Sequence, residues 1–185
     1  MKAPKAPRFY FIKEIAIVVI GVLIAVSISN FKESQDNEAY FKKTMIAVKS
    51  EILASLQDVN DVYSRHVEVA DSVQSNLQND ETLMEIVFEA GGIQIAETKN
   101  IGLRFFISHK ADLVEYQMIS DLMEIENTNR ILEKKMDYLL EFAYADMFKE
   151  DPKSKEKFLI YLYNVMDSEQ SLIVQYDDFL SNYTE

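Results

Sequence analysis

One feature constrains this chain more than any other: an apolar run from Ile15 to Phe31 without a charged side chain, which reads IAIVVIGVLIAVSISNF. As a helix it spans about 26 Å at about 1.5 Å per residue, close to the roughly 30 Å hydrocarbon core of a bilayer. No other stretch of the sequence is as long and as free of charge. The run therefore predicts one transmembrane helix at residues 15–31.

The charges around this run predict its orientation. Residues 1–14 form a short basic tail with the charged residues Lys2, Lys5, Arg8, Lys13 and Glu14. Only Lys32 follows closely on the other side, so the positive-inside rule places the tail in the cytoplasm and residues 32–185 across the membrane. The alternative is a cleaved signal peptide, since Ala25, Ser27 and Ser29 are small. A retained anchor is favoured because the run leads directly into a helical pattern.

The chain carries 19 Lys and Arg against 31 Asp and Glu. Residues 1–14 account for four basic and one acidic side chain, which leaves 15 basic and 30 acidic residues and a net charge of −15 beyond them. Such a surface repels phosphates, so no nucleic-acid partner is expected. The sequence has no cysteine, which excludes disulfides, thiolate metal sites and cysteine nucleophiles.

Apolar residues recur every three or four positions after the run and predict a long helix over about 37–79 that continues from the transmembrane helix. The predicted buried seam consists of Phe41, Met45, Val48, Ile52, Leu56, Val59, Tyr63, His66, Ala70, Val73 and Leu77. The eleven residues from Met45 to Leu56 break the heptad spacing and predict a stutter.

The rest of the chain also predicts helices, because it contains only 4 Gly and 3 Pro. A short helix is expected over 81–90, ending at Gly91-Gly92. Residues 93–107 are expected to form an irregular loop or a minor hairpin, and the sequence leaves both open. Further helices are expected from Asp112 to Glu126, from Ile131 to about Asp151 after a break at 127–129, and from Pro152 onward. The predicted fold class is all-α, an anchor and stalk helix followed by a helical bundle.

Within the anchor, Gly21, Ala25 and Ser29 recur every four residues and share one helix face, where a second backbone could approach closely. The expected partners are the lipid bilayer and either a second copy of the chain or another membrane or envelope protein. Alternatively, the small residues face lipid.

The sequence carries no recognisable reactive site. His66 lies on the seam, where a core or interface histidine is more common than a metal ligand. His109 precedes a helix and fits a loop or cap better than a general base. Tyrosines 138, 144, 161, 163, 176 and 183 have helical spacing typical of core or interface residues, and the glycines match no phosphate-binding loop. No catalytic residue, metal or cofactor is predicted, and the chain is not expected to be an enzyme.

The run KEIAIVVIGVLIAVSISNFKES, with Glu14, Gly21, Asn30 and Phe31, resembles the N-terminal signature of an uncharacterised Bacteroidota-type bacterial family of single-pass membrane proteins. The stretch YQMISDLMEIENTNRILEKKMDYL is similar to that family's second block, but it lacks the glycine usual in the break. The resemblance implies a bacterial inner-membrane anchor with a periplasmic domain of unknown function. It implies no activity.

These observations favour a non-enzymatic, membrane-anchored interaction or scaffold subunit of a cell-envelope assembly. The alternative is an extracytoplasmic ligand-sensing helical bundle that acts through a partner protein. A hydrolase with two acids in a cleft is a third hypothesis.

Overall fold

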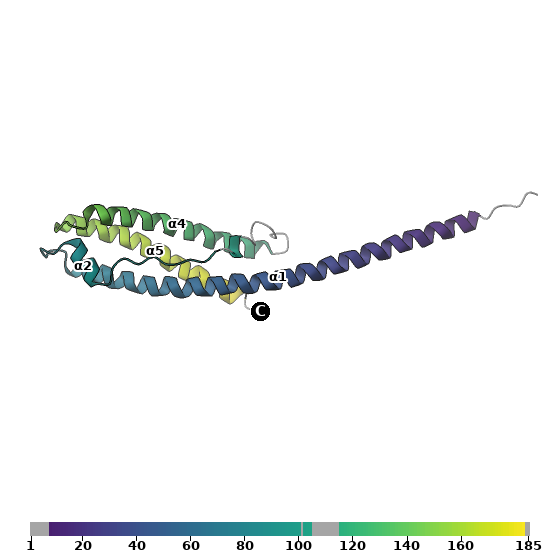
Figure 1. Cartoon of the computed structure of the whole chain (residues 1–185), viewed down its shortest axis with the longest axis horizontal. Coiled ribbons are helices and arrows are strands. Elements are labelled where there is room, and N and C mark those ends of the chain that lie inside the picture. The colour runs from purple at the N-terminus through teal and green to yellow at the C-terminus, as the bar shows by residue number, and fades with distance from the viewer. Residues whose placement is uncertain (1–7, 101, 105–114, 184–185) are drawn as a thin grey trace, which may run out of the picture. The chain divides into compact units, whose positions relative to one another are not determined.

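The computed structural model describes residues 8–100, 102–104 and 115–183 (Figure 1). Its helices are α1 (Arg8–Ser75), α2 (Leu83–Glu89), α4 (Tyr116–Asp146) and α5 (Pro152–Asn182). Residues 102–104 add one helical turn, and no strand occurs in these described ranges. The predicted all-α fold class is therefore confirmed.

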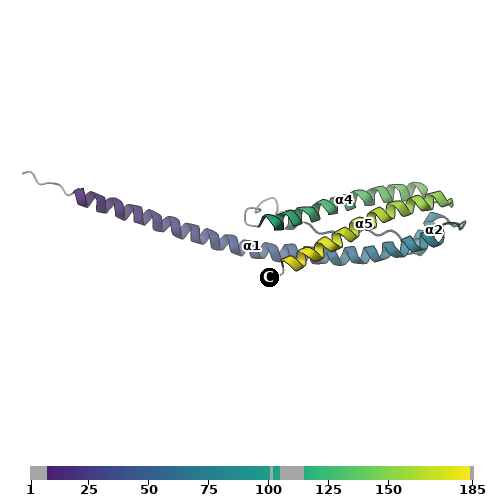
Figure 2. The ribbon, with the colours of Figure 1, turned by 180° about the vertical axis from the view of Figure 1, so that it is seen from behind.

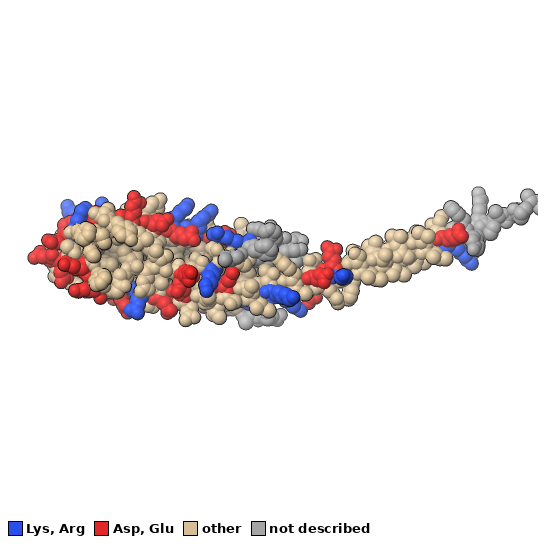
Figure 3. All heavy atoms as spheres, in the orientation of Figure 1, with Lys and Arg blue, Asp and Glu red and all other residues tan. Residues whose placement is uncertain are grey.

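The chain divides into two compact units, residues 1–43 and 44–185. In the first unit, every side chain from Ile15 to Phe31 is exposed. Figure 3 shows this part of α1 as a stretch without charged atoms. Within this stretch the Ser27 hydroxyl makes a local contact by donating to the Leu23 carbonyl at 2.8 Å. The helix is long and apolar enough to cross a membrane, by length and composition alone.

The second unit is a helical bundle made of residues 44–75 of α1 together with α2, α4 and α5 (Figures 1 and 2). Helices α4 and α5 form a closely packed antiparallel pair. The first turns of α4 meet the end of α5 where the Tyr183 hydroxyl donates to the Asp121 carboxylate at 2.7 Å. Helix α1 joins α5 through His66 and Glu169, both fully buried.

On α1 and α4 a series of buried residues follows the heptad alternation of three and four without a break, as in a coiled coil. On α1 the series is Met45, Val48, Ile52, Ser55, Val59, Val62, His66, Val69 and Val73, and Ala70 is buried in addition. On α4 they are Leu122, Ile125, Asn129, Leu132, Met136 and Leu139. The predicted stutter is wrong, because Ser55 and Val62 occupy the core positions while Leu56 and Tyr63 are half-buried.

We call residues 92–100 and 102–104 the return segment. They include the described part of the region for which the sequence predicts a loop or a minor hairpin. Residues 93–100 are extended without strand pairing. Side chains of α1 hold this backbone, and their numbers fall as those of the return segment rise, so it runs antiparallel to α1. The four contacts are Gln94 with His66, Glu97 with Asp58, Lys99 with Ser55 and Gly102 with Glu51. Of the two predicted alternatives, the described residues therefore form an extended loop packed on α1 and not a hairpin.

The helix ends agree with the predictions in part. Thr82 and Glu85 form a capping box on α2, and Gly91 and Gly92 adopt positive φ after it, at 98° and 79°. Asp151 caps α5, with Pro152 in its first turn. The predicted start at Asp112 lies outside the described residues.

The predicted break at 127–129 is wrong, because α4 continues through it. Thr128 satisfies its hydroxyl within the helix by donating to the Glu124 carbonyl at 3.1 Å. Asn129 is buried and accepts a hydrogen bond from Tyr176 at 3.1 Å. Tertiary contacts therefore outweigh the weak helix preference of these residues.

Candidate functional site

The residues predicted for helix packing in the membrane lie in the first unit. Gly21, Ala25 and Ser29 are all exposed, and a Cβ added at Gly21 would meet no atom within 4 Å. This helix face is therefore unoccupied within the described chain.

The predicted seam residues lie mostly in the core. Met45, Val48, Ile52, Val59 and His66 are buried. Ala70 and Val73 are buried as well. The remaining four, Phe41, Leu56, Tyr63 and Leu77, are half-buried. The seam thus packs inside the bundle.

His66 is a core histidine with two partners. Its Nε2 lies 3.0 Å from the Gln94 carbonyl oxygen, which can only accept, so Nε2 carries a proton. Its Nδ1 lies 3.0 Å from the Glu169 carboxylate. Because that contact also needs a proton, the imidazole and carboxylate are either an ion pair or a neutral pair sharing one hydrogen. The site is sealed, with both side chains at 0% exposure, and it joins α1, α5 and the return segment.

A second polar layer lies one heptad along α5. The Tyr176 hydroxyl donates to Asn129 Oδ1 at 3.1 Å, and burial raises the pKa of this tyrosine, an effect opposed by its hydrogen bonds with Asn129 and Ser55. Asn129 Nδ2 is buried and has no acceptor among the described residues. These contacts fix how the helices pair, and no reactive group among them reaches solvent.

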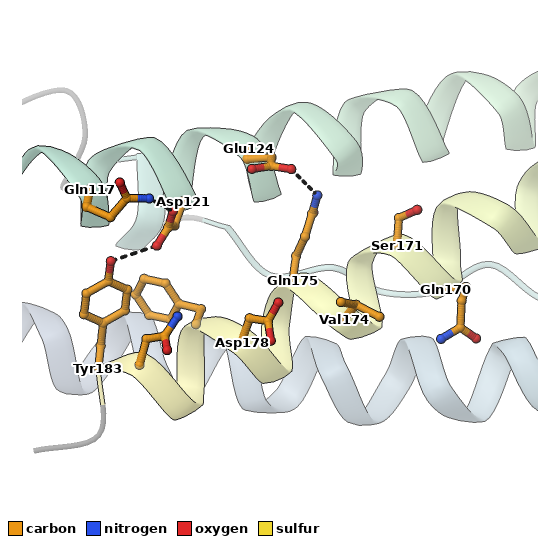
Figure 4. Close-up of a pocket in the computed structure, with 11 residues that line it drawn as sticks. Gln117, Asp121, Glu124, Gln170, Ser171, Val174, Gln175, Asp178 and Tyr183 are labelled. Atoms are coloured by element: carbon orange, nitrogen blue, oxygen red, sulfur yellow. Dashed lines mark hydrogen bonds between the residues drawn. The ribbon is translucent and has the colours of Figure 1, made fainter.

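An open groove of about 640 Å³ lies between the first turns of α4 and the last turns of α5 (Figure 4). Its lining is polar and acidic, and it consists of Gln117, Asp121, Glu124, Gln170, Ser171, Val174, Gln175, Asp178, Phe179, Asn182 and Tyr183. No basic side chain is among these lining residues. We call it the acidic groove.

Two of the three carboxylates that line the acidic groove, Asp121 and Glu124, have hydrogen-bond partners. Asp121 accepts from Tyr183 at 2.7 Å and from Gln117 at 2.8 Å, and Glu124 accepts from Gln175 at 3.1 Å (Figure 4). Burial and the Asp121 carboxylate together raise the pKa of Tyr183 to about 12, so its hydroxyl stays a donor at neutral pH. The groove can therefore accept hydrogen bonds from a cationic or amide-bearing ligand, while Asp121 and Glu124 are engaged in holding the helices.

A smaller groove of about 230 Å³ lies at the opposite end of the bundle, between α2, the last turns of α4 and the first turns of α5. Its lining is almost entirely apolar, and it consists of Leu83, Met84, Val87, Phe88, Gly92, Ile93, Leu140, Ala143, Tyr144, Met147 and Phe158. We call it the apolar groove. Phe88 and Tyr144 remain 77% and 70% exposed.

Sequence reasoning missed both grooves. Of the six tyrosines expected in the core or in an interface, Tyr176 is fully buried. Tyr138, Tyr144, Tyr161 and Tyr163 are exposed and so are not core residues, and an interface role for them stays a prediction. The available signal was the placement of Phe88 and Tyr144 beside acidic residues, outside the heptad positions. His109 lies outside the described residues, and the described residues hold no group of three or more potential metal ligands.

Comparison of the chain with protein-family models, with curated proteins and with solved structures finds no match. The resemblance of the anchor run to a bacterial membrane-protein family therefore stays a hypothesis.

Proposed function

We propose that this protein is a single-pass, membrane-anchored interaction subunit of a bacterial cell-envelope assembly. The observation that carries the proposal is the helical stretch 15–31, whose side chains are uncharged and all exposed. Such a surface is costly in water at about 25 cal/mol per Å² of apolar area and stable in a bilayer. The helix holds the acidic domain at a membrane surface.

The orientation follows from the flanking charges. Four basic residues precede the helix, which keeps residues 1–14 in the cytoplasm and the domain in the periplasm. The bilayer is then one partner, and the exposed stripe of Gly21, Ala25 and Ser29 is the face for a second copy or another membrane protein.

An interaction role fits the domain better than catalysis. The buried polar groups bond inside the bundle: His66 to Glu169 and to the Gln94 carbonyl, and Tyr176 to Asn129. Asp121 and Glu124 of the acidic groove likewise support α4 and α5. The described domain exposes two grooves and several aromatic side chains to solvent, which suits the binding of a partner.

Protease accessibility of the full chain in its membrane tests the proposal. In intact spheroplasts, added protease should digest residues 44–185 and leave the anchor fragment in the membrane. A domain that is protected until the cells are lysed would overturn the orientation. A full-length chain recovered without membranes would overturn the anchor itself.

The acidic groove favours a second candidate function, sensing of a cationic ligand. A linear diamine is the simplest probe, because carboxylate and amide oxygens accept its N–H donors. Sensing predicts that the diamine raises the unfolding temperature of the full chain and that Asp178→Asn reduces this shift. Asp71→Asn, on the exposed α1 surface outside the groove, is the control and should keep the wild-type shift. A loss of shift in Asp71→Asn as large as in Asp178→Asn supports a general ionic effect instead.

A further inference from the structure

We propose that the apolar groove docks an amphipathic segment of another protein that presents one or two large apolar side chains flanked by Lys or Arg. This goes beyond membrane anchoring because it names a surface of the domain and the chemistry of its partner. It holds on either side of the membrane, so its test and the protease test can fail separately.

The groove is built on a fixed scaffold. The Met84 amide donates to the Met147 carbonyl at 2.7 Å, and the Leu83 amide donates to the Lys149 carbonyl at 3.1 Å. Leu83 is buried at 1% exposure and ties α2 to the core. Helix α2 is therefore held at the end of α4, and the groove exists before any partner binds, which lowers the cost of docking.

Large apolar side chains stand exposed along the groove without serving the core. Met84, Phe88 and Tyr144 line the groove, and they are 41%, 77% and 70% exposed. Phe148, the residue after the lining residue Met147, is 73% exposed. Aromatic residues and methionine are the types enriched at protein interfaces. With a volume of about 230 Å³ the groove is smaller than the 300–1,000 Å³ typical of small-molecule sites, so it suits one or two side chains.

The charges around the groove select the partner. Residues 80–89 and 137–151 contain the acids Asp80, Glu81, Glu85, Glu89, Asp137, Glu141, Asp146, Glu150 and Asp151. The one basic residue in these two ranges, Lys149, is paired with Asp146 at 2.7 Å. The first turns of α5, which also border the groove, add the exposed residues Lys153, Glu156 and Lys157, so acidic residues still outnumber basic ones around it. Figure 3 shows acidic atoms gathered at the α2 end of the bundle.

Several of these acids are held in the ionised form. A hydrogen bond from the Thr82 amide lowers the pKa of Glu85. The hydrogen bond from Lys149 lowers the pKa of Asp146, and that from the Ser154 hydroxyl lowers the pKa of Asp151. The rim is therefore negative at neutral pH.

This charge excludes two other occupants. A second copy would bring an identical acidic rim against the first, and like charges across an interface oppose association. An anionic lipid surface would be repelled in the same way. A basic amphipathic helix combines apolar anchors with complementary charge, which is a common mode of groove recognition.

The test uses the full chain in zwitterionic lipid nanodiscs with ¹³C-methyl methionine, and a synthetic amphipathic helix made of Leu and Lys as the probe. Met84 and Met147 line the groove, whereas Met45 and Met136 lie in the core away from it. Binding should shift the Met84 and Met147 methyl signals and leave the other two unchanged. Phe88→Ser should weaken binding at least tenfold, while the control Ile160→Ser, on an exposed face of α5, should not.

Two further peptides separate the sources of binding. Replacing Leu by Gln tests the apolar anchors, and replacing Lys by Glu tests the charge. Loss of binding with both peptides supports the proposal. Equal binding of the Glu peptide, or methyl shifts in Met45 as strong as in Met84, would overturn it, and so would an unchanged affinity of Phe88→Ser.

Discussion

His66 on α1 and Glu169 on α5 face each other across the bundle, with 3.0 Å between imidazole Nδ1 and carboxylate Oε1 and no solvent exposure of either side chain. They lie 103 residues apart in the sequence. Their contact joins the segment that continues from the anchor helix to the last helix of the domain, and the Gln94 carbonyl adds the return segment to the same histidine.

Removing one member of this pair should cost more than removing both. Glu169→Ala leaves His66 Nδ1 buried without its partner, and we expect a loss of about 3–5 kcal/mol in the free energy of unfolding. In the double variant His66→Leu with Glu169→Leu, apolar packing should recover much of that loss. Chemical denaturation followed by circular dichroism measures the wild type, Glu169→Ala, the single variants His66→Leu and Glu169→Leu, and the double variant. A double variant as unstable as the sum of the single variants would contradict the pairing.

Lys155 should stabilise the end of α1. Its side chain is fully buried, and its ammonium donates to the carbonyls of Asn76 and Asn79 at 3.0 and 2.7 Å, just beyond the last residue of α1. A cation there complements the helix dipole. Lys155→Met should lower the free energy of unfolding by about 1–3 kcal/mol. The exposed control Lys153→Met should change it by less than about 0.5 kcal/mol, and equal effects would refute the cap.

Tyr183 should make the α4–α5 contact sensitive to alkali. Its folded pKa is raised to about 12, because burial and the Asp121 carboxylate disfavour the phenolate, whereas an unfolded tyrosine titrates near about 10. A pKa raised in the folded state gives stability that is complete below about pH 10 and lost as the pH rises through about 12.

The measurement is a spectroscopic tyrosine titration of wild type and Tyr183→Phe, whose difference isolates this hydroxyl. Asp121→Asn should move the midpoint back toward the ordinary value. Tyr138→Phe, at an exposed position on α4 outside this contact, is the control for the loss of one phenol. A Tyr183 midpoint near 10 in the wild type would disprove the coupling.

The anchor stripe should mediate assembly. Gly21→Leu places a large side chain on the face shared with Ala25 and Ser29, so close helix approach should be lost. Val19→Leu enlarges the opposite face and should have no effect. The effect of each substitution is measured as the mass of the complex purified in mild detergent. A wild-type monomer without a co-purifying protein, or an assembly indifferent to Gly21→Leu, would count against the proposed interface.

Periodicity predicted the all-α class, α2 and the start of α5, because these follow from local spacing and caps. It failed at Ser55 and at Asn129, which apolar patterning assigns to the surface or to a break. Both are buried because partners distant in sequence satisfy them: the Lys99 amide donates to Ser55 at 2.8 Å, and Tyr176 donates to Asn129. Such pairings leave no local signature.

The apolar groove was out of reach of the sequence for the same reason. Its shape depends on where α2 lies, and α2 is held by backbone hydrogen bonds to residues 147 and 149, more than sixty positions later. The sequence pattern predicted α2 and the glycines that end it, but not that α2 packs against the end of α4.

The return segment implies an order of folding. Its described backbone is hydrogen-bonded to side chains of α1 and not to another strand. The path of the return segment is therefore defined only after α1 has become helical and has brought these side chains onto one face. The pairing of α4 with α5 joins neighbouring helices and needs no such template, so it is expected to form early. Pulsed hydrogen exchange during refolding would show late protection of the Lys99 and Gly102 amides. Residues 44–75 of α1 thus provide the surface on which the middle of the chain is later placed.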